Sequence, residues 1–420
     1  MKYLEKIKTK TAFEIIFIAT VGLSFLLWII FIAVDGEASS QFRIFSENLW
    51  DFLADSTNVI GYSAGRNPYN NHIFGLAEKA YPPLTYVLMF LVSRVVQVNS
   101  YAEKFGDYKN LWTDPKVLIL IIIMTVVVVI MMYTIIQVTK NGSMLIKSLV
   151  AFVLCCSFPM LFSIERGNTI IITAILCMFY LFYYNSENKI LKELALISLA
   201  IAVAFKITPA FLGILLLYNK QFKDSIRTVI YGIIIVFGPF VFLQGGFSNI
   251  PLMFNNIFLN LKAYSSPEGC TFAGSFSKFG QVLTSNDYIV PDIWVAILKI
   301  TTVIISIILL SVLPFFKTQW EKVATVVIIL IILPSHSGTY CVLYMIPVII
   351  MFLNEEKHGN VDIIYLLCMI MISWVYFCKL SDYIFNIHLA LPVMTITLLI
   401  TGISNAKNYY KQKKISGKGV

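Results

Sequence analysis

Residues 12–34 read AFEIIFIATVGLSFLLWIIFIAV, and they form the first of many apolar runs in the chain. A helix of this length can cross the hydrocarbon core of a bilayer, which is roughly 30 Å thick. The run also exceeds the roughly 7–15 apolar residues of a cleaved signal peptide. We therefore predict that it stays in the mature protein as a membrane anchor.

The composition extends this prediction to the whole chain. Of its 420 residues, 58% are hydrophobic and only 13% are charged, whereas an ordinary soluble domain is about one quarter charged. Apolar runs long enough to span a membrane recur along the sequence. We therefore expect an all-α fold, a polytopic bundle of transmembrane helices that forms a single domain over residues 1–420.

The net charge of +9 comes largely from lysines in short loops and at the two ends of the chain. Basic residues in short loops mark the cytoplasmic side of a membrane protein, so this charge does not indicate nucleic-acid binding. Six of the seven cysteines lie in apolar runs, and no pair of histidines has the spacing of metal ligands. The sequence therefore predicts no metal, no cofactor and no nucleic-acid partner.

The basic loops also predict a topology. If the short run 84–97 does not cross the membrane, the Lys-rich loops face the cytoplasm, whereas a crossing there would invert every later loop. The first interpretation gives about twelve crossings, cytoplasmic termini and a basic tail at 404–420. It leaves two large external loops, about 35–82 and 244–291, and the first is expected to carry short helices.

This topology places the polar features of the chain on its outer face. The most distinctive lie in and just after the first external loop, where Asp51-Phe52 precedes Gly65-Arg66-Asn67-Pro68-Tyr69 and then Tyr81-Pro82-Pro83-Leu84. An aspartate in such a loop could act as a general base that takes a proton from an attacking hydroxyl. The alternative interpretation of Asp51 is a solvated loop acid.

The two later segments of this loop are candidates for substrate binding. Asn67-Pro68 predicts a turn, in which Gly65 permits unusual backbone angles. Tyr81-Pro82-Pro83 is expected to open the next helix, where the first amides have no intrahelical partner. Arg66, Asn67, Tyr69 and Tyr81 would then line the substrate loop, while plain turn residues and tyrosines at the lipid headgroup level are the alternatives.

Three further positions are candidates for contacts to a phosphate group. Lys206 interrupts an apolar stretch, and a lysine ammonium in the membrane costs at least about 2.5–3.5 kcal/mol. We therefore expect its ammonium either to contact an anion such as a phosphate or to reach the membrane interface by snorkelling. Arg166 directly follows Glu165, and since adjacent helix residues do not face each other, one or both need another partner. The planar fork of Arg166 suits a phosphate. His336 lies between two serines in a short external turn, where a phosphate contact and an ordinary turn role are both open.

Taken together, these segments resemble glycosyltransferase family 87. The order of Asp51-Phe52, Gly65-Arg66-Asn67-Pro68-Tyr69 and Tyr81-Pro82-Pro83-Leu84 carries the resemblance. Gly167-Asn168 is similar to a helix start of the family, Phe205-Lys206-Ile207-Thr208-Pro209 to its Lys-x-x-Pro segment, and Pro334-Ser335 with Tyr340 and Pro347 to its late motif. Leu53-Ala54-Asp55 stands where the family often has aromatic residues, so Asp55 stays an alternative to Asp51 as the base.

The resemblance implies an integral-membrane enzyme of the GT-C type, with a catalytic acid in the first external loop and inversion at the anomeric carbon. The expected reaction moves a hexose, mannose-like, from a polyprenyl-phosphate donor to a lipid or glycan acceptor at the outer face of the cytoplasmic membrane. Asp51, or alternatively Asp55, would activate the acceptor. The remaining candidates are Lys206, Arg166 and His336 for the donor phosphate, and Arg66, Asn67, Tyr69, Tyr81, Glu165 and Asn168 for the substrate loop.

Two other functions share this topology. A transporter or flippase for lipid-linked sugars would show broken helices near the membrane midplane, and only the stretch around Lys206-Ile207-Thr208-Pro209 fits that description. A polymerase or ligase of surface polysaccharide would require a diphosphate-linked glycan donor.

Overall fold

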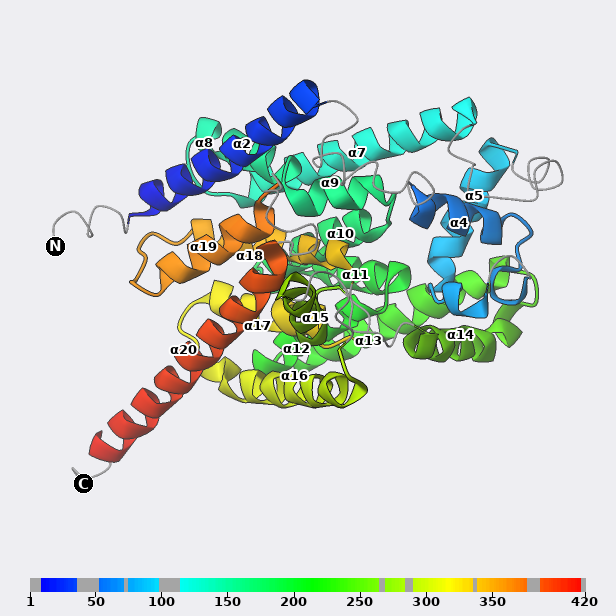
Figure 1. Cartoon of the computed structure of the whole chain (residues 1–420). Helices are drawn as coiled ribbons and strands as arrows, with labels where there is room; N and C mark the ends of the chain where they lie inside the picture. Colours follow the sequence, from blue (N-terminus) through cyan, green and yellow to red (C-terminus); the bar gives the residue numbers. More distant parts are fainter. Residues whose placement is uncertain are drawn as a thin grey trace. The chain divides into compact units, whose positions relative to one another are not determined.

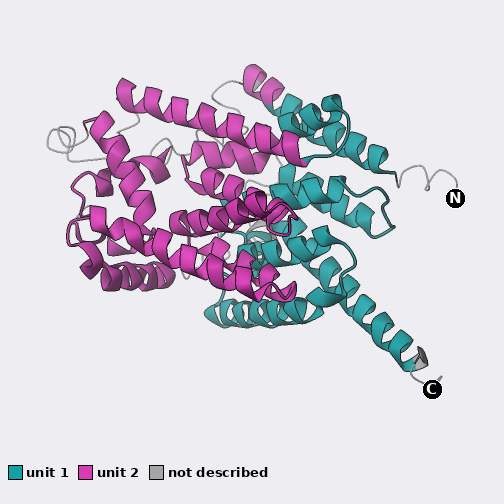
Figure 2. Cartoon of the chain, turned by 180° about the vertical axis from the view of Figure 1, so that it is seen from behind, with its two compact units in different colours: residues 1–28, 140–153, 266–420 teal, residues 29–139, 154–265 magenta. Residues whose placement is uncertain are grey.

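The computed structural model describes residues 9–35, 53–71, 75–97, 114–263, 269–283, 290–334, 338–375 and 386–416. Within these ranges the chain is helical and has no β-strand, apart from an isolated bridge between Thr9 and Lys357. The predicted all-α fold is therefore confirmed. Figure 1 shows the helices along the chain, and Figure 2 colours the two compact units into which they divide.

The central unit comprises residues 29–139 and 154–265. Its α-helices are α4 (Ala54–Ser63), α5 (Pro83–Val95), α7 (Pro115–Thr139), α9 (Phe158–Glu165), α10 (Ile170–Tyr183), α11 (Lys189–Phe205), α12 (Ile214–Tyr218), α13 (Phe222–Phe237) and α14 (Ile250–Ala263). Its 3₁₀ helices are η3 (Pro68–Asn70), η4 (Leu76–Glu78), η6 (Thr208–Gly213), η7 (Gly238–Phe242) and η8 (Gly246–Asn249). Short helices thus occur within the segment expected to form the first external loop.

The terminal unit comprises residues 1–28, 140–153 and 266–420. Its helices are α15 (Phe272–Leu283), α16 (Asp292–Val312), η9 (Leu313–Phe315), α17 (Gln319–Ile332), η10 (Thr339–Met345), α18 (Ile346–Leu353), α19 (Asp362–Ser373) and α20 (Asn386–Ser416). Helices α2 (Lys10–Asp35) and α8 (Met144–Cys155) have residues in both units. Each unit combines segments from different parts of the sequence. A single domain over residues 1–420 stays a prediction.

A buried ion pair marks the terminal unit. The Lys140 ammonium donates to the Glu14 carboxylate of α2, and also to the main-chain oxygens of Asn141 at 2.7 Å and Leu353 at 3.2 Å. The side chains of Lys140 and Glu14 are 0% and 6% exposed. These additional hydrogen bonds matter because a buried charge is costly unless its donors and acceptors are paired.

Several described helices are long and apolar enough to cross a membrane. They are α2, α7, α13 with η7, α16 with η9, and α20, and the bent pair α8 and α9 adds a sixth if it counts as one span. This number indicates a multi-pass membrane protein. Shorter apolar helices at Pro83–Val95, Ile170–Tyr183, Thr208–Tyr218, Thr339–Leu353 and Asp362–Ser373 leave the total open, so about twelve crossings and cytoplasmic termini stay predictions.

Prolines set two helix boundaries. α5 begins at Pro83 with Pro82 as its N-cap, which confirms the helix start expected there. The apolar run 148–164 reads as one helix in the sequence, but it is divided into α8 and α9 at Ser157, whose backbone is extended. Pro159 explains the division, because its missing amide and its ring prevent a helix from continuing through this point.

The core of the central unit joins α4, η3, α5, α7, η7 and α14. Tyr69 of η3 and Tyr86 of α5 are among its largest members, and they are 1% and 0% exposed. Their ring centroids lie 5.1 Å apart in an edge-to-face arrangement, which is favourable for aromatic pairs. This packing fixes the polar segments of residues 53–71 and 79–83 against the helices that follow them.

Candidate active site

The start of α4 is held on the turn between α9 and α10. The amide of Leu53 donates to the carbonyl oxygen of Glu165 at 2.8 Å, and the amide of Asp55 donates to that of Arg166 at 3.1 Å. The Ser56 hydroxyl donates to the carbonyl oxygen of Gly167, 111 positions later in the sequence. The polar segment after Asp51 is therefore fixed on the turn that carries the Arg166 candidate.

The Asp55 carboxylate lies between two side chains of this turn. Its Oδ1 accepts from Arg166 Nη2 at 2.9 Å, and its Oδ2 accepts from Asn168 Nδ2 at 2.6 Å and from Arg166 Nε at 3.4 Å. The side chains of Asp55 and Arg166 are 18% and 19% exposed, so water only partly screens the ion pair. Arg166 thus has a partner away from Glu165, as its position required, and that partner is the alternate base.

Gly167 permits the close approach of the two segments. Its φ is +61°, and a Cβ at this position would lie 2.7 Å from Ser56 Oγ and 3.3 Å from Leu53 Cδ2. Glycine alone adopts this backbone conformation at little cost. On the next residue, Asn168 Oδ1 accepts from the amide of Ile170, the first residue of α10, at 2.8 Å. Glu165 is 7% exposed, and its carbonyl oxygen is the group that holds Leu53.

The predicted turn at Gly65–Tyr69 forms, but its unusual residue is not the glycine. The left-handed backbone belongs to Arg66, with a φ of 59°, whereas Gly65 is not left-handed. Tertiary contacts stabilise this conformation, because Arg66 Nε donates to the carbonyl oxygen of Phe242 at 2.8 Å and the amide of Gln244 donates to that of Arg66 at 2.8 Å. The cost of such a residue must be offset by its surroundings.

The tyrosines of the loop are structural groups of the core. The Tyr69 hydroxyl donates to the carbonyl oxygen of Tyr81 at 2.8 Å, and the amide of Tyr81 donates to the Tyr86 hydroxyl at 3.3 Å. Since Tyr69 is 1% exposed, its ring packs inside the protein and is not available as an exposed interface anchor. Asn67 contributes through its carbonyl oxygen, which accepts from Asn71 Nδ2 at 3.1 Å.

Lys206 lies at the break that follows α11, and the ring of Tyr81 is its neighbour. Its backbone is extended as the C-cap of α11, and Pro209 lies in the first turn of η6, so the expected break is present. Lys206 Nζ is 5.6 Å from the centroid of the Tyr81 ring, within cation–π range. Next to Lys206, the Phe205 carbonyl oxygen accepts from the Thr85 hydroxyl of α5 at 3.0 Å. Two separate sequence motifs therefore meet here.

Sequence reasoning missed Lys79 and did not predict the main-chain contacts of Asn256. The Lys79 side chain is buried, its ammonium donates to the carbonyl oxygen of Asn71, and burial lowers its pKa. Asn256 of α14 donates to the main-chain oxygen of Tyr69 at 3.1 Å. Both side chains bind main-chain oxygens, which carry no sequence signal, so the pattern of residue types could not reveal them.

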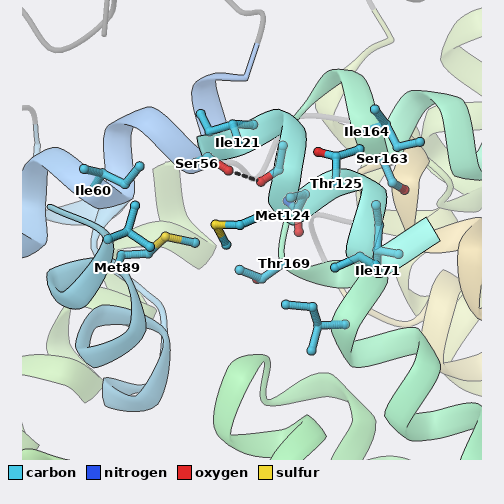
Figure 3. A pocket seen from close by; sticks show the side chains of 15 residues that line it. Ser56, Ile60, Met89, Ile121, Met124, Thr125, Ser163, Ile164, Thr169 and Ile171 are labelled. Atoms are coloured by element: carbon cyan, nitrogen blue, oxygen red, sulfur yellow. Dashed lines mark hydrogen bonds between the residues drawn. The ribbon is translucent and has the colours of Figure 1, made fainter. Parts of the chain in front are cut away.

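A cavity of about 50 Å³ lies beside the α9–α10 turn, and we call it the turn cavity. Ser56 of α4, Ser163 of α9, and Asn168 and Thr169 of the turn give it a polar side. Met89 and Val92 of α5 and Ile121 and Met124 of α7 are part of its apolar side. In Figure 3 the side chains of Met89 and Met124 point toward each other, with Thr169 close by.

A larger cavity, of about 370 Å³, lies between α11, η6, α12 and α13, and we call it the break cavity. Apart from Ser225 and Thr228, its lining is apolar or glycine, and it includes Val203 and Ala210 on either side of the Lys206 break. Helix packing is interrupted here because η6 replaces a regular continuation of α11.

Comparison with known proteins identifies the family of the chain. The family model described as glycosyltransferase family 87 matches residues 80–335, more than half of the chain. The chain belongs to glycosyltransferase family 87. It is therefore a membrane glycosyltransferase, as the sequence motifs predicted. No curated protein and no solved structure matches the chain.

The family 87 match covers Tyr81, Arg166 and Lys206 but begins after Asp51 and Asp55. The hydrogen bonds of Leu53, Asp55 and Ser56 thus connect a segment outside the match to a turn inside it.

Two of the predicted site residues, Asp51 and His336, lie outside the described residues. Their roles stay predictions. Among the residues that the structure does describe, no group of three or more His, Cys, Asp or Glu side chains could hold a metal ion. A reaction that needs no metal also stays a prediction.

Proposed function

We propose that this family 87 enzyme is an inverting, GT-C-type hexosyltransferase. It moves a mannose-like hexose from a polyprenyl-phosphate donor to a lipid or glycan acceptor at the outer face of the cytoplasmic membrane. The observation that carries the proposal is the clamp of residues 53–56 on the Arg166-Gly167-Asn168 turn. It joins a carboxylate-bearing segment to a guanidinium, which are the two kinds of group that the reaction needs.

Asp51 is the proposed base, and Asp55 is the proposed positioning residue. Both carboxylate oxygens of Asp55 already accept hydrogen bonds from Arg166 and Asn168, so they are poorly placed to accept a proton from a substrate. Asp51 precedes the anchored Leu53 by two residues, and two extended residues span at most about 7 Å. This short separation in the sequence supports the choice of Asp51 as the base.

The reaction is a single displacement with a simple balance. The acceptor O–H bond breaks as its proton passes to Asp51, and the acceptor oxygen forms a bond to C1 of the sugar. The bond from C1 to the phosphate oxygen breaks, and polyprenyl phosphate leaves with that electron pair. Inversion follows because attack and departure occur on opposite faces of C1.

Cationic side chains would stabilise the departing phosphate. Asp55 fixes the orientation of the Arg166 guanidinium, and Lys206 is held near Tyr81. Preorganised charges aimed at a developing negative charge supply a large part of many catalytic effects. His336 is retained as a third donor in this proposal.

The break cavity offers room for donor hydrocarbon. Its lining is largely apolar, and Val203 and Ala210 place it within four residues of Lys206 along the chain. An isoprenoid chain could occupy it while the phosphate stays near the ammonium. This arrangement supports a donor that enters from the lipid phase.

The test compares three conservative variants of the purified full-length enzyme, assayed with a panel of polyprenyl-phosphate sugars. Asp51→Asn should lower kcat by about 10²–10⁴-fold, the usual contribution of a general base. Asp55→Asn should act mainly by raising the KM for the donor, because Arg166 loses its charged partner. Glu78→Gln, an exposed acid of η4, should behave as the wild type.

Each outcome separates the candidates. Loss of kcat in Asp55→Asn with normal activity in Asp51→Asn would assign the base to Asp55. Normal kcat in both variants would contradict a carboxylate base in this segment. Counterflow of lipid-linked sugar without product would favour the transport alternative.

A further inference from the structure

Two arginines from separate segments of the central unit meet at one aromatic ring of α5. The guanidinium carbon of Arg94 lies 4.7 Å from the centroid of the Phe90 ring, and that of Arg66 lies 5.9 Å from the same centroid. Both arginines are exposed, and Phe90 is partly buried. Arg66 is held in this place because its Nε donates to the carbonyl oxygen of Phe242 at 2.8 Å. We call these two side chains and the ring between them the arginine pair.

No acidic side chain neutralises the arginine pair among the described residues, where every ion pair involves other groups. Contact with an aromatic ring stabilises each cation, but two like charges held at one ring repel each other. An anion bound to both guanidiniums would remove this repulsion. The planar fork of arginine matches the oxygens of a phosphate group, so a phosphate is the anion that the arginine pair fits best.

Exposed apolar side chains lie next to the arginine pair. On α5, Leu91 is 57% exposed and Val95 is 68% exposed, and on η7, Val241 is 56% exposed and Phe242 is 60% exposed. In a multi-pass membrane protein such side chains face hydrocarbon. A guanidinium in hydrocarbon is costly, so arginines beside them extend to the level of the lipid head groups. The arginine pair therefore lies where phospholipids place their phosphates.

The arginine pair is separate from the cations proposed for the donor phosphate. Lys206 lies at the ring of Tyr81, which precedes α5, whereas Arg94 lies in the last turn of that helix. At a rise of about 1.5 Å per residue, about 16 Å of helix separates the start of α5 from Arg94. A single phosphate group cannot span this distance, so the arginine pair requires a ligand of its own.

We propose that Arg66, Phe90 and Arg94 form a binding site for the head group of an anionic phospholipid. The phosphate lies between the two guanidiniums, and the acyl chains lie along the apolar residues of α5 and η7, such as Leu91 and Val241. A soluble phosphate lacks the hydrocarbon that this apolar surface selects. A zwitterionic lipid carries an ammonium group that the guanidiniums repel. The inference requires only a membrane protein and is independent of the proposed reaction.

The first experiment measures lipid binding to the full-length protein purified in detergent. Native mass spectrometry follows titrations with dioctanoyl phosphatidylglycerol and with dioctanoyl phosphatidylcholine, which have the same acyl chains. The anionic lipid should bind at least about tenfold more tightly, since each arginine near the head group adds electrostatic attraction. Equal affinities would overturn the inference. Displacement of phosphatidylglycerol by an equal concentration of inorganic phosphate would also overturn it, because the site would then select a soluble anion.

The second experiment uses matched variants that each remove or alter one exposed cation. Arg94→Gln should weaken binding of phosphatidylglycerol about fivefold, and Arg94→Lys should have a smaller effect because it keeps the charge and loses the fork. Lys116→Gln, in the first turn of α7, removes the same charge elsewhere and should leave the affinity unchanged. An equal loss in Arg94→Gln and Lys116→Gln would overturn the inference, because it would show attraction to net charge alone.

The third experiment tests whether the ring holds the two guanidiniums for one ligand. Phe90→Leu keeps an apolar side chain and removes the ring, and it should weaken binding of phosphatidylglycerol. The same substitution should have a smaller effect in the Arg94→Gln background, since one of the two guanidiniums is already absent. An equal effect in both backgrounds would overturn the role of the ring. An unchanged unfolding temperature in each variant is the control for folding.

Discussion

Gly167 determines how closely the first polar segment approaches the α9–α10 turn. Its left-handed backbone and its contact with Ser56 leave no room for a side chain. The position of Asp55 depends on this contact, because its amide and carboxylate both bind the same turn. A single methyl group at residue 167 should therefore disturb both stability and catalysis.

Gly167→Ala should destabilise the protein by about 1–3 kcal/mol, since it combines an unfavourable φ with a clash. Thermal unfolding of the purified protein would measure the loss. Gly65→Ala is the matched control, because an added Cβ there has no neighbour within 4 Å. Adding Ser56→Gly should recover part of the loss by removing the clash. An unfolding temperature of Gly167→Ala equal to that of the wild type would contradict this account.

At the same scale, the sequence predicted some contacts and missed others for physical reasons. Arg166 needed a partner outside its helix, and the structure supplies Asp55. The left-handed residue of the first turn could not be located, because contacts of Arg66 with Phe242 and Gln244 outweigh the intrinsic preference of Gly65. Such contacts join residues far apart in the sequence, so a local sequence pattern cannot predict them.

At the scale of elements, the break between α11 and α12 does two things. It places Lys206 next to Tyr81, and it leaves the break cavity open between α11 and α13. Gly232 of α13 lines that cavity, and an added Cβ on it would have no neighbour within 4 Å. The cavity can therefore be filled from α13 without a clash at the backbone.

Gly232→Leu should raise the KM for the polyprenyl-phosphate donor about tenfold, because the new side chain takes the place of donor hydrocarbon. Gly232→Ala is the matched control, and its effect should be much smaller. Stability should not fall, since glycine is the poorer helix former. Donor kinetics of Gly232→Leu that equal those of the wild type would show that the break cavity does not hold the donor.

The elements themselves were largely predictable. The apolar run 12–34 predicted α2, and the paired prolines predicted the start of α5. The division of α8 from α9 was missed, because hydrophobicity continues through Ser157 while the backbone does not. Hydrophobicity reports which residues can be buried, and it does not report where a helix changes direction.

At the scale of the whole molecule, the family match and the apolar helices define a multi-pass membrane glycosyltransferase. The side of the membrane predicted for each loop rests on the distribution of basic residues along the whole chain. The connection between α10 and α11 is expected in the cytoplasm, and the segment after α13 is expected outside. Exposed residues are available in both, namely Glu187 and Ser248.

Single cysteines at these positions, in a chain whose seven native cysteines are replaced, would test the orientation. Ser248→Cys should react with a membrane-impermeant maleimide on intact cells, whereas Glu187→Cys should react only after the cells are permeabilised. Retained transferase activity is the control for folding. The reverse labelling pattern would mean that the run 84–97 crosses the membrane.

The ion pair of Lys140 and Glu14 constrains how the protein is made. Glu14 leaves the ribosome 126 residues before Lys140, so α2 is synthesised well before the partner of its acid. Until Lys140 has been synthesised, the Glu14 carboxylate cannot form this buried pair, and a lone charge in hydrocarbon is costly. The buried pair of the first helix can therefore form only after a third of the polypeptide has been synthesised.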